Sequence, residues 1–374
     1  MMGIFTLPPK LPRADLDLES LLRSNATETP VRRFRRTLAA EWFPQSGIQL
    51  TWPHADTDWA PYLEDVTETY LRMAFEIATR EKLLIVHPRP TEVREMLARK
   101  LPRRATDNII YHACATDDTW ARDHAFLTVV GTGTPELIDF CFNGWGGKFE
   151  ASQDNAINRS LFDEGVVRGR YVDRLDFELE GGSIESDGMG TLLTTAACLH
   201  NPNRQRPEGA DVEQVLREVF GIDHVLWLEH GALAGDDTDS HVDTLARLCP
   251  DNKIVYVKCD NPDDEHFEAL QRMEAQLQSF RNAEGEAFDL VPVPLPDAIM
   301  QDGERLPATY ANYLVLNRAI LLPVYGQKEK DERARSALQG VFPKYDIVPI
   351  DSRVLIRQHG SIHCATMQFP RGIL

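Results

Sequence analysis

The sequence predicts one α/β domain built from a unit of about 65 residues that recurs five times. Short β-like runs are centred on residues 50, 127, 192, 255 and 320, and the gaps between these centres are 77, 65, 63 and 65 positions. Helical patterns and further β-like runs lie between them. No Gly/Ser-rich linker divides the chain of 374 residues, so we predict one domain rather than several.

The recurring β-like runs cover residues 47–52, 125–130, 190–195, 253–257 and 318–324. Second strands are predicted over residues 83–87, 224–229, 291–295 and 346–350. Apolar residues recur every three or four positions over residues 62–80, 212–220 and 265–281. This spacing is typical of amphipathic helices, so we predict helices over those three ranges.

Residues 1–38 are predicted to form an N-terminal extension, and residues 39–374 the single domain. The extension holds three prolines among its first twelve residues and four arginines between residues 32 and 36. Acidic residues at positions 15, 17 and 19 argue against a transit peptide, so we interpret the segment as a partly ordered arm. Its basic cluster is either a solvated charge run or a surface that packs on the acidic body or on a neighbouring subunit.

Charge and cysteine usage exclude several classes of protein. The net charge of −18 argues against a nucleic-acid partner, because phosphate binding needs a basic surface. It suits either a cationic substrate or simple solubility. No apolar run reaches the roughly 18–20 residues of a membrane helix, so we expect no membrane partner. The six cysteines form no Cys-x-x-Cys pair, which favours reduced thiols in a cytoplasmic enzyme over a zinc or disulfide site.

Four short motifs carry the side chains with the most chemistry. They are Trp120-Ala-Arg-Asp123, Leu179-Glu-Gly-Gly182, His241-Val-Asp243 and His363-Cys364. Glu180 follows Asp123 by 57 positions, His241 follows Glu180 by 61, and Cys364 follows His241 by 123, which is about two further steps. A site that takes one group from each structural unit would show this spacing.

Each motif also has a structural interpretation. Cys364 follows a Gly-Ser turn and could be a buried cysteine, whereas a nucleophilic role needs a cation beside the thiol. Residues two apart in a strand face the same side, so His241 and Asp243 would share a cavity; a solvated acidic loop and a metal-hydrolase site remain open. An EF-hand calcium site is excluded, because the twelfth position counted from Asp236 holds Arg247 instead of Glu.

The remaining groups are equally ambiguous when taken singly. Glu180 precedes two glycines and fits an exposed hairpin turn as well as a site. Asp123 follows Arg122 and fits a surface ion pair, and Trp120 is either core or a pocket wall. Because all the motifs occur in order and at the spacing of the repeated unit, we predict that they meet in one site.

Longer stretches around these residues resemble the agmatine deiminase family, relatives of the bacterial peptidylarginine deiminases in the guanidine-modifying superfamily. The resemblance runs from residue 40 to the C-terminus. It is carried by Ala40-Glu41-Trp42, Leu50-Thr51-Trp52-Pro53, Trp120-x-Arg-Asp123, Phe142-Asn-Gly-Trp-Gly-Gly-Lys148, Leu179-Glu-Gly-Gly-Ser-Ile184, Asp187-Gly188, Asp237-Thr-Asp-Ser-His-Val-Asp243 and Ile362-His-Cys364. It implies a five-bladed α/β propeller of ββαβ-like units with pseudo-fivefold symmetry, and no metal or cofactor.

The resemblance also implies a role for each of five residues. Cys364 is the nucleophile that attacks the guanidinium carbon, and His241 is the general acid and base. Asp123 and Asp243 hold the guanidinium nitrogens by paired hydrogen bonds, and Glu180 bonds the guanidinium and pairs with His241. The implied intermediate is an S-alkylthiouronium, which water hydrolyses to a ureido product.

Agmatine carries a second cation, its primary ammonium, and Asp237 and Trp120 are the candidates to bind it. Two departures from the family pattern lie nearby. Ser240 stands where many relatives have Gly, and Gln358-His359-Gly360-Ser361 replaces a common Gly-Gly-Gly-Asn. We expect these changes to bear on the choice of substrate more than on the core chemistry.

The predicted function is therefore the hydrolysis of agmatine to N-carbamoylputrescine and ammonia, a step of polyamine biosynthesis. The alternatives are a deiminase of free arginine, which would need a cation for the α-carboxylate, a deiminase of peptidyl-arginine, and a non-catalytic protein of the same fold. The resemblance further suggests a homodimer or larger homo-oligomer.

Overall fold

The protein has a mixed α/β fold, and the computed structural model describes residues 36–374. The predicted extension, residues 1–38, lies outside the described residues except for its last three. Of these, residues 37 and 38 form strand β1 (Thr37–Leu38), which pairs with β5 (Leu127–Val130). Arg36 binds Glu136, with Nη2 and Oε2 2.7 Å apart. These three residues therefore belong to the folded unit rather than to an arm.

Five sheets repeat one topology around five central strands. The central strands are β2 (Gln45–Thr51), β6 (Glu136–Cys141), β9 (Thr191–Thr195), β12 (Lys253–Lys258) and β17 (Ala319–Val324). Each pairs in parallel with, respectively, β3 (Lys82–His87), β7 (Arg170–Glu178), β10 (His224–Leu228), β13 (Asp289–Pro294) and β18 (Asp346–Asp351). On the other side each pairs antiparallel with, respectively, β19 (Thr366–Pro370), β5, β8 (Ile184–Ser186), β11 (Ala246–Cys249) and β16 (Leu314–Leu316).

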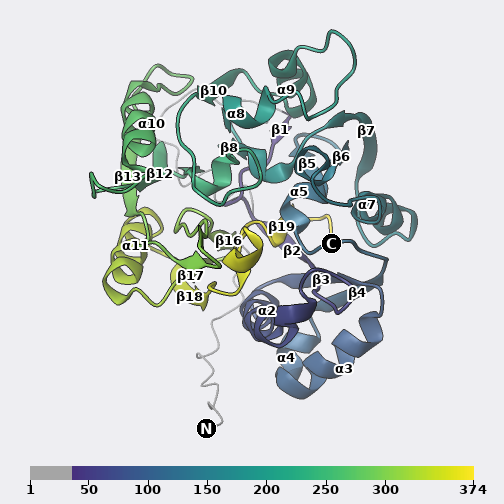
Figure 1. Ribbon diagram of the computed structural model, residues 1–374. Coiled ribbons are helices and arrows are strands. Elements are labelled where there is room, and N and C mark those ends of the chain that lie inside the picture. Colours follow the sequence, from purple (N-terminus) through teal and green to yellow (C-terminus); the bar gives the residue numbers. More distant parts are fainter. Residues whose placement is uncertain (1–35) are drawn as a thin grey trace. The chain divides into compact units, whose positions relative to one another are not determined.

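A helix connects each central strand to its parallel neighbour, as parallel strands require. These helices are α2 (Leu63–Ala78), α7 (Asp154–Asp163), α9 (Val212–Phe220), α10 (Phe267–Ser279) and α11 (Lys328–Val341). Figure 1 shows the sheets following one another in chain order, with β19 beside β2. The last strand of the chain thus completes the sheet of the first central strand, and each of these five sheets contains the strand order antiparallel, central, parallel.

Smaller elements fill the connections. They are α3 (Pro90–Lys100), α4 (Arg103–Thr106), α5 (Ala121–His124), α6 (Gly144–Gly147), α8 (Ala196–Leu199), the 3-10 helices η1 (Ala60–Tyr62), η2 (Gly181–Ser183), η3 (Val242–Thr244) and η4 (Leu355–Gln358), and the strands β4 (Ile109–Ala113), β14 (Met300–Gln301) and β15 (Glu304–Arg305). Among the described residues, no helix has both the length and the apolar content that a membrane crossing needs.

The predicted helices form because each buries one apolar face. The helix predicted over 212–220 has the same bounds as α9, which starts where the Asp211 side chain caps the Gln214 amide and ends at Gly221 in the left-handed conformation. Leu216 and Phe220 are buried on its inner face. The structure thereby confirms the three predicted helices to within two residues at each end.

The predicted second strands are confirmed as β3, β10, β13 and β18, but one recurring run was misplaced within its unit. Residues 125–130 contain β5, which is the antiparallel strand of its sheet, and the central strand of that sheet is β6. The other four runs are central strands. The gaps of 77 and 65 positions on either side of residue 127 therefore each separate an antiparallel strand from a central strand, not two central strands.

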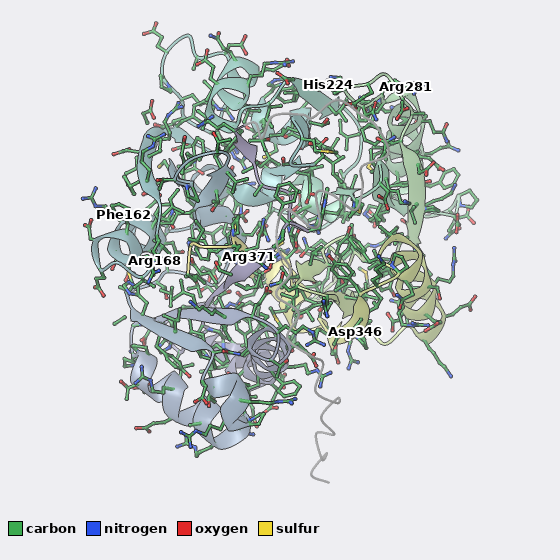
Figure 2. All side chains as sticks on the ribbon, turned by 180° about the vertical axis from the view of Figure 1, so that it is seen from behind. Phe162, Arg168, His224, Arg281, Asp346 and Arg371 are labelled. Atoms are coloured by element: carbon green, nitrogen blue, oxygen red, sulfur yellow. The ribbon has the colours of Figure 1, made fainter. Side chains whose placement is uncertain are left out.

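The C-terminal segment ties two units together behind the sheets. After β19, the Arg371 amide donates to the Pro44 carbonyl at 2.8 Å, and the Arg168 amide donates to the Ile373 carbonyl at 2.8 Å. Figure 2 shows Arg371 and Arg168 in the rear view. These backbone bonds hold β19, and with it the loop that carries Cys364, against the rest of the molecule.

Candidate active site

The predicted catalytic residues occupy one recurring position of the fold, directly before the antiparallel strand of a unit. Asp123 lies in α5 before β5, and Glu180 precedes η2 and β8. His241 and Asp243 lie at η3 before β11, and Cys364 precedes β19. Their spacing along the sequence therefore has a structural cause: each unit delivers side chains from the same turn.

The fifth unit contributes Asn312, which comes directly before β16. It follows Asp243 by 69 residues and precedes Cys364 by 52, so it fills the missing step between those motifs. Its Oδ1 accepts hydrogen bonds from the amides of His363 at 3.0 Å and Cys364 at 3.3 Å, and Sγ of Cys364 lies 3.4 Å from the same oxygen. Asn312 therefore fixes the turn that holds the predicted nucleophile.

Asp123 is fully enclosed and held by two donors. Nε1 of Trp145 donates to Oδ2 at 3.0 Å, and the Gly182 amide donates to Oδ1 at 2.9 Å. Nδ1 of His241 lies 3.6 Å from Oδ1. These contacts leave the carboxyl group a single orientation beside the imidazole.

Gly182 is required because three functional groups approach its backbone. A Cβ atom at this position would lie 2.7 Å from Nδ1 of His241, 2.8 Å from Oδ1 of Asp123 and 3.1 Å from Oδ2 of Asp243. A side chain of any size would displace these groups. The glycine that the sequence offered as a hairpin residue is instead part of the wall of the site.

Glu180 pairs with Arg204 rather than with His241. Nε of Arg204 donates to Oε1 of Glu180 at 2.9 Å, and both side chains are buried. Oε2 of Glu180 and both ring nitrogens of His241 have no hydrogen-bond partner among residues 36–374. The expected pair between Glu180 and His241 is therefore absent from this structure, and Arg204 is the cation that compensates the buried glutamate.

Asp243 stands between the predicted nucleophile and a histidine. Its Oδ2 accepts a 2.7 Å hydrogen bond from Nδ1 of His363 and lies 3.9 Å from Sγ of Cys364. Its Oδ1 is buried without a partner in the described part of the chain. One oxygen of Asp243 is thus fixed by the protein, and the other is free to accept a donor from a ligand.

Burial and mutual repulsion shift the pKa values of these groups. Burial, together with the charges of Asp243 and Glu180, raises the pKa of Asp123 well above its ordinary value. Burial and the charges of Asp243 and Asp123 likewise raise the pKa of the Cys364 thiol. Burial lowers the pKa of His241 to about 3. At neutral pH the protein alone therefore holds a thiol and a neutral imidazole, and a cation bound among the carboxylates would favour the thiolate of Cys364.

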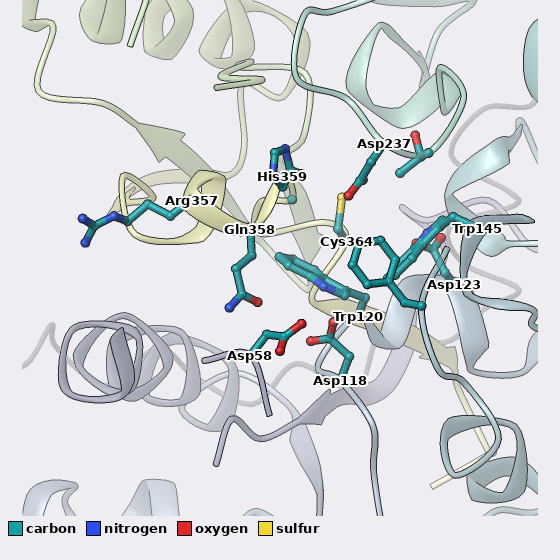
Figure 3. Close-up of a pocket in the computed structure, with 13 residues that line it drawn as sticks. Asp58, Asp118, Trp120, Asp123, Trp145, Asp237, Arg357, Gln358, His359 and Cys364 are labelled. Atoms are coloured by element: carbon teal, nitrogen blue, oxygen red, sulfur yellow. The ribbon is translucent and has the colours of Figure 1, made fainter. Parts of the chain in front are cut away.

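A cavity of about 210 Å³ opens onto Cys364. Figure 3 shows Trp120, Asp237 and His359 around the thiol, with Asp58 and Asp118 farther along the wall. The cavity thus contains both side chains predicted for the distal end of the substrate.

Trp120 forms the floor of the cavity and packs against the nucleophile loop. The ring centroids of Trp120 and Trp59 lie 5.8 Å apart, and a Cβ atom on Gly360 would lie 2.3 Å from the indole of Trp120. Gly360 is therefore needed for the close approach of loop and indole. Of the two interpretations of Trp120 left open by the sequence, the structure supports both, since the ring is buried and also lines the cavity.

A model of the Porphyromonas-type peptidyl-arginine deiminase family matches residues 37–370. The chain belongs to this family. It is 33% identical to the agmatine deiminase of Ectopseudomonas mendocina, over 89% of this chain and 95% of the relative. It is 31% identical to the agmatine deiminase of Stutzerimonas stutzeri, over 92% of this chain and 98% of the relative.

Solved structures agree with this family assignment. A C. jejuni agmatine deiminase with substrate bound is 34% identical and superposes with a TM-score of 0.82, covering 93% of this chain and 100% of that chain. A Porphyromonas gingivalis protein, described provisionally as an arginine deiminase, is 44% identical with a TM-score of 0.85, covering 91% of this chain and 100% of that chain. Both extend over nearly the whole described fold.

The two departures from the family pattern fall where the backbone adopts the left-handed region. Ser240 has φ of 69° and His359 has φ of 66°, conformations that glycine adopts at lower cost. Each is stabilised by a hydrogen bond: the Thr195 hydroxyl donates to the Ser240 carbonyl at 2.7 Å, and Nδ1 of His359 lies 2.6 Å from the Gly235 carbonyl. The side chain of His359 thereby reaches the cavity wall, where a family glycine would present none.

Two clusters of potential metal ligands occur among the described residues, each with ligand atoms within 4.8 Å of one another. They are Glu180, Cys198 and His241, and Glu41, Glu185 and His363. In the second, the guanidinium of Arg247 bonds to both glutamates. In the first, Arg204 binds Glu180, and three ligands are one fewer than structural zinc sites use.

Four residues of the site were not given a role from the sequence. They are Trp145, Arg204, Asn312 and His363. Trp145 and His363 lie inside the stretches that resemble the family, which was a usable signal. Asn312 could have been found by searching one unit spacing beyond Asp243. Arg204 lies in no motif, and the pairing of its guanidinium with Glu180 depends on the folded chain.

Proposed function

We propose that this chain hydrolyses the guanidinium group of agmatine, with ammonia and N-carbamoylputrescine as products. One observation carries the proposal: Oε2 of Glu180, both nitrogens of His241 and Oδ1 of Asp243 are buried without partners among residues 36–374, and Oδ2 of the same Asp243 lies 3.9 Å from Sγ of Cys364. Buried polar atoms are normally satisfied. A planar guanidinium, with N–H donors on every nitrogen, matches a set that is rich in acceptors.

The charge of the site favours the same ligand. Asp123, Glu180 and Asp243 lie together, and within residues 36–374 only Glu180 has a direct guanidinium partner, Arg204. A bound guanidinium neutralises part of this charge. It also stabilises the Cys364 thiolate, which burial and the neighbouring carboxylates disfavour by raising the pKa of the thiol. The nucleophile is therefore activated when the substrate is in place.

The proposed reaction proceeds in two halves. With the guanidinium bound, the proton of the Cys364 thiol passes to His241, and the thiolate attacks the guanidinium carbon. The imidazolium then gives this proton to one nitrogen, and the C–N bond breaks to release ammonia. Water, deprotonated by His241, then attacks the thiouronium carbon; the C–S bond breaks and the ureido product leaves. Asp123 and Asp243 hold the planar group so that its carbon faces Sγ, and this positioning supplies much of the rate.

At the far end of the cavity, Asp237 and Trp120 are proposed to bind the primary ammonium of agmatine. Burial raises the pKa of Asp237 to about 6, so its carboxyl group is charged at neutral pH. The indole of Trp120 offers a face to the alkyl chain and the cation. Asp58 and Asp118 also line this cavity and support a cationic tail. Burial raises the pKa of Asp118 to about 7, so this carboxyl group is only partly charged at neutral pH.

Free arginine is the second candidate, because one cation lines the cavity. Nε of Arg357 donates to Gln301 at 2.7 Å, and its guanidinium lies 4.1 Å from the ring centroid of Tyr62. In Figure 3 this guanidinium points away from Cys364, so binding an α-carboxylate in the cavity would require Arg357 to change its side-chain conformation. The description of the P. gingivalis structure points to arginine. Peptidyl-arginine stays an alternative without a residue that favours it.

The test is ammonia release from agmatine, free arginine and a blocked arginine peptide, with Cys364→Ala as the control. We expect turnover of agmatine and none by Cys364→Ala. Turnover of arginine, lost on Arg357→Ala, would replace agmatine by the second candidate. Undiminished activity in Cys364→Ala would refute the nucleophile.

We further propose that the five sheets form a five-bladed propeller with pseudo-fivefold symmetry. The shared topology of the sheets and the pairing of β19 with β2 support it. The free state of all six cysteines supports a cytoplasmic location. Assembly into a homodimer or larger homo-oligomer stays a prediction, which light scattering of the purified chain would test.

A further inference from the structure

Two family-like segments hold charged side chains that the proposed chemistry leaves without a role. Glu41 lies in the Ala40-Glu41-Trp42 stretch near the start of the domain, and His363 directly precedes the nucleophile. Glu41 is 7% exposed and His363 is 1% exposed. Burying such groups costs free energy unless they are paired, so their surroundings show what holds them and what they hold.

His363 lies between two carboxylates. Its Nδ1 is 2.7 Å from Oδ2 of Asp243, and its Nε2 is 3.0 Å from Oε2 of Glu41. Nη2 of Arg247 also lies 2.9 Å from Nε2. A carboxylate is an acceptor only, so Nδ1 carries a proton and donates to Asp243. The imidazole ring thereby connects Glu41 to a carboxylate of the active site.

The outer end of this chain of contacts is held rigidly. Oε1 of Glu41 accepts from the Val315 amide at 2.7 Å. Arg247 binds Glu41 and Glu185 and donates to the carbonyls of Ala311 at 3.0 Å and Tyr313 at 2.7 Å. Every contact is buried; the donors come from strands β11 and β16, and the accepting carbonyls lie in the turn before β16. Glu41 therefore cannot move without breaking several hydrogen bonds.

We propose that Glu41 and His363 are positioning residues that fix Asp243 through Oδ2, so that its unpartnered Oδ1 faces the guanidinium of the substrate. The proposal rests on the proposed function, because it assigns Asp243 to guanidinium binding. It explains why one oxygen of Asp243 is saturated and the other has no partner in the described chain. Outer partners of this kind commonly alter activity by 10–100-fold when they are removed.

The ionisation of Asp243 agrees with this arrangement. Burial alone would raise the pKa of its carboxyl group, but the hydrogen bond and the charge of His363 bring that pKa below its ordinary value. A charged Asp243 is the form that binds a cation. His363 therefore has two effects on one residue, orientation and charge.

The test compares His363→Asn with His363→Leu on agmatine and on free arginine. An asparagine can place its Nδ2 donor near the position of Nδ1, whereas leucine offers no donor. We expect kcat to fall about 100-fold in His363→Leu and about 10-fold or less in His363→Asn, with KM changing less than kcat, because Asp123 and Glu180 still bind the guanidinium. For Glu41→Gln we expect kcat to fall about 10-fold.

The matched control is His112→Asn. His112 is a buried histidine outside the site, and its Nε2 contacts Ser160. This substitution should leave kcat unchanged, and calorimetry reports folding for every variant. Equal losses in folded His363→Asn and His363→Leu, or kcat within threefold of the unmodified enzyme in folded His363→Leu or Glu41→Gln, would overturn the proposal. A wrong substrate assignment gives a different result. The unmodified enzyme then fails to turn over agmatine, while the ratios of kcat between the variants and the unmodified enzyme are as predicted on arginine.

Discussion

Replacing Gly182 by alanine should impair turnover strongly while leaving the fold intact. The new methyl group would lie 2.7 Å from Nδ1 of His241 and 2.8 Å from Oδ1 of Asp123. Ordinary contact begins near 3.4 Å, so the two groups must move by about 0.7 Å and 0.6 Å. Their freedom is small, because Trp145 and the Gly182 amide both donate to Asp123.

The expected loss follows from the size of this displacement. A misplacement of about 1 Å in an active site costs on the order of 100-fold in rate. We therefore expect kcat/KM for Gly182→Ala to fall about 30- to 100-fold, equivalent to about 2 to 2.7 kcal/mol of activation free energy. Gly182 lies in η2, a backbone conformation open to alanine, so the melting temperature should change little.

The assay is ammonia release over a range of agmatine concentrations, paired with calorimetry. Gly340→Ala is the matched control, because Gly340 lies in α11 and a Cβ atom there meets nothing within 4 Å. It should stabilise the helix by up to about 1 kcal/mol and leave kcat/KM unchanged. A folded Gly182→Ala with kcat/KM within threefold of the unmodified enzyme would refute the account of Gly182.

Three further predictions concern charge. Because burial raises the pKa of Asp237 to about 6, KM for agmatine should fall as pH rises through 6. Asp237→Asn should remove that trend and raise KM about tenfold at pH 8. A KM that does not change with pH in the unmodified enzyme would contradict this prediction. Arg204→Met leaves Glu180 buried without its cation and should destabilise the fold by about 3–5 kcal/mol with a large loss of kcat; an unchanged melting temperature argues against it. Burial raises the pKa of Glu81 to about 8 from 4.5, so its ionisation lowers stability progressively between those values, by at most about 1.4 kcal/mol per pH unit. Glu81→Gln should therefore raise the melting temperature at pH 8 more than at pH 5, and an equal change at both would contradict the shift.

Much of the fold could be predicted because local patterns matched it. Strand β10 follows from a short apolar run, and helix α9 from apolar spacing and a capping aspartate; these signals act over a few residues. The role of β5 could not be assigned in this way, because an antiparallel strand and a central strand have similar compositions. Pairing partners decide that distinction, and β19 pairs with β2 across more than 300 residues of sequence.

The candidate site shows the same limit to what can be predicted from the sequence. Asp123, Glu180, His241, Asp243 and Cys364 were predicted together from their motifs, and the structure brings them together. The pairing of Glu180 was wrong, because Arg204 reaches the glutamate from a segment without a motif. Long side chains that cross between units cannot be placed from sequence spacing, whereas groups that recur at one turn of each unit can.

The most direct test of the central claim is mass spectrometry, of the intact protein and of its proteolytic peptides, after an acid quench during turnover of agmatine. The account predicts an adduct equal to agmatine less one ammonia, carried by the peptide that contains Cys364 and absent from Cys364→Ala, which should also release no ammonia. Ammonia release by Cys364→Ala at the rate of the unmodified enzyme, with no adduct on Cys364 of the unmodified enzyme, would contradict the account.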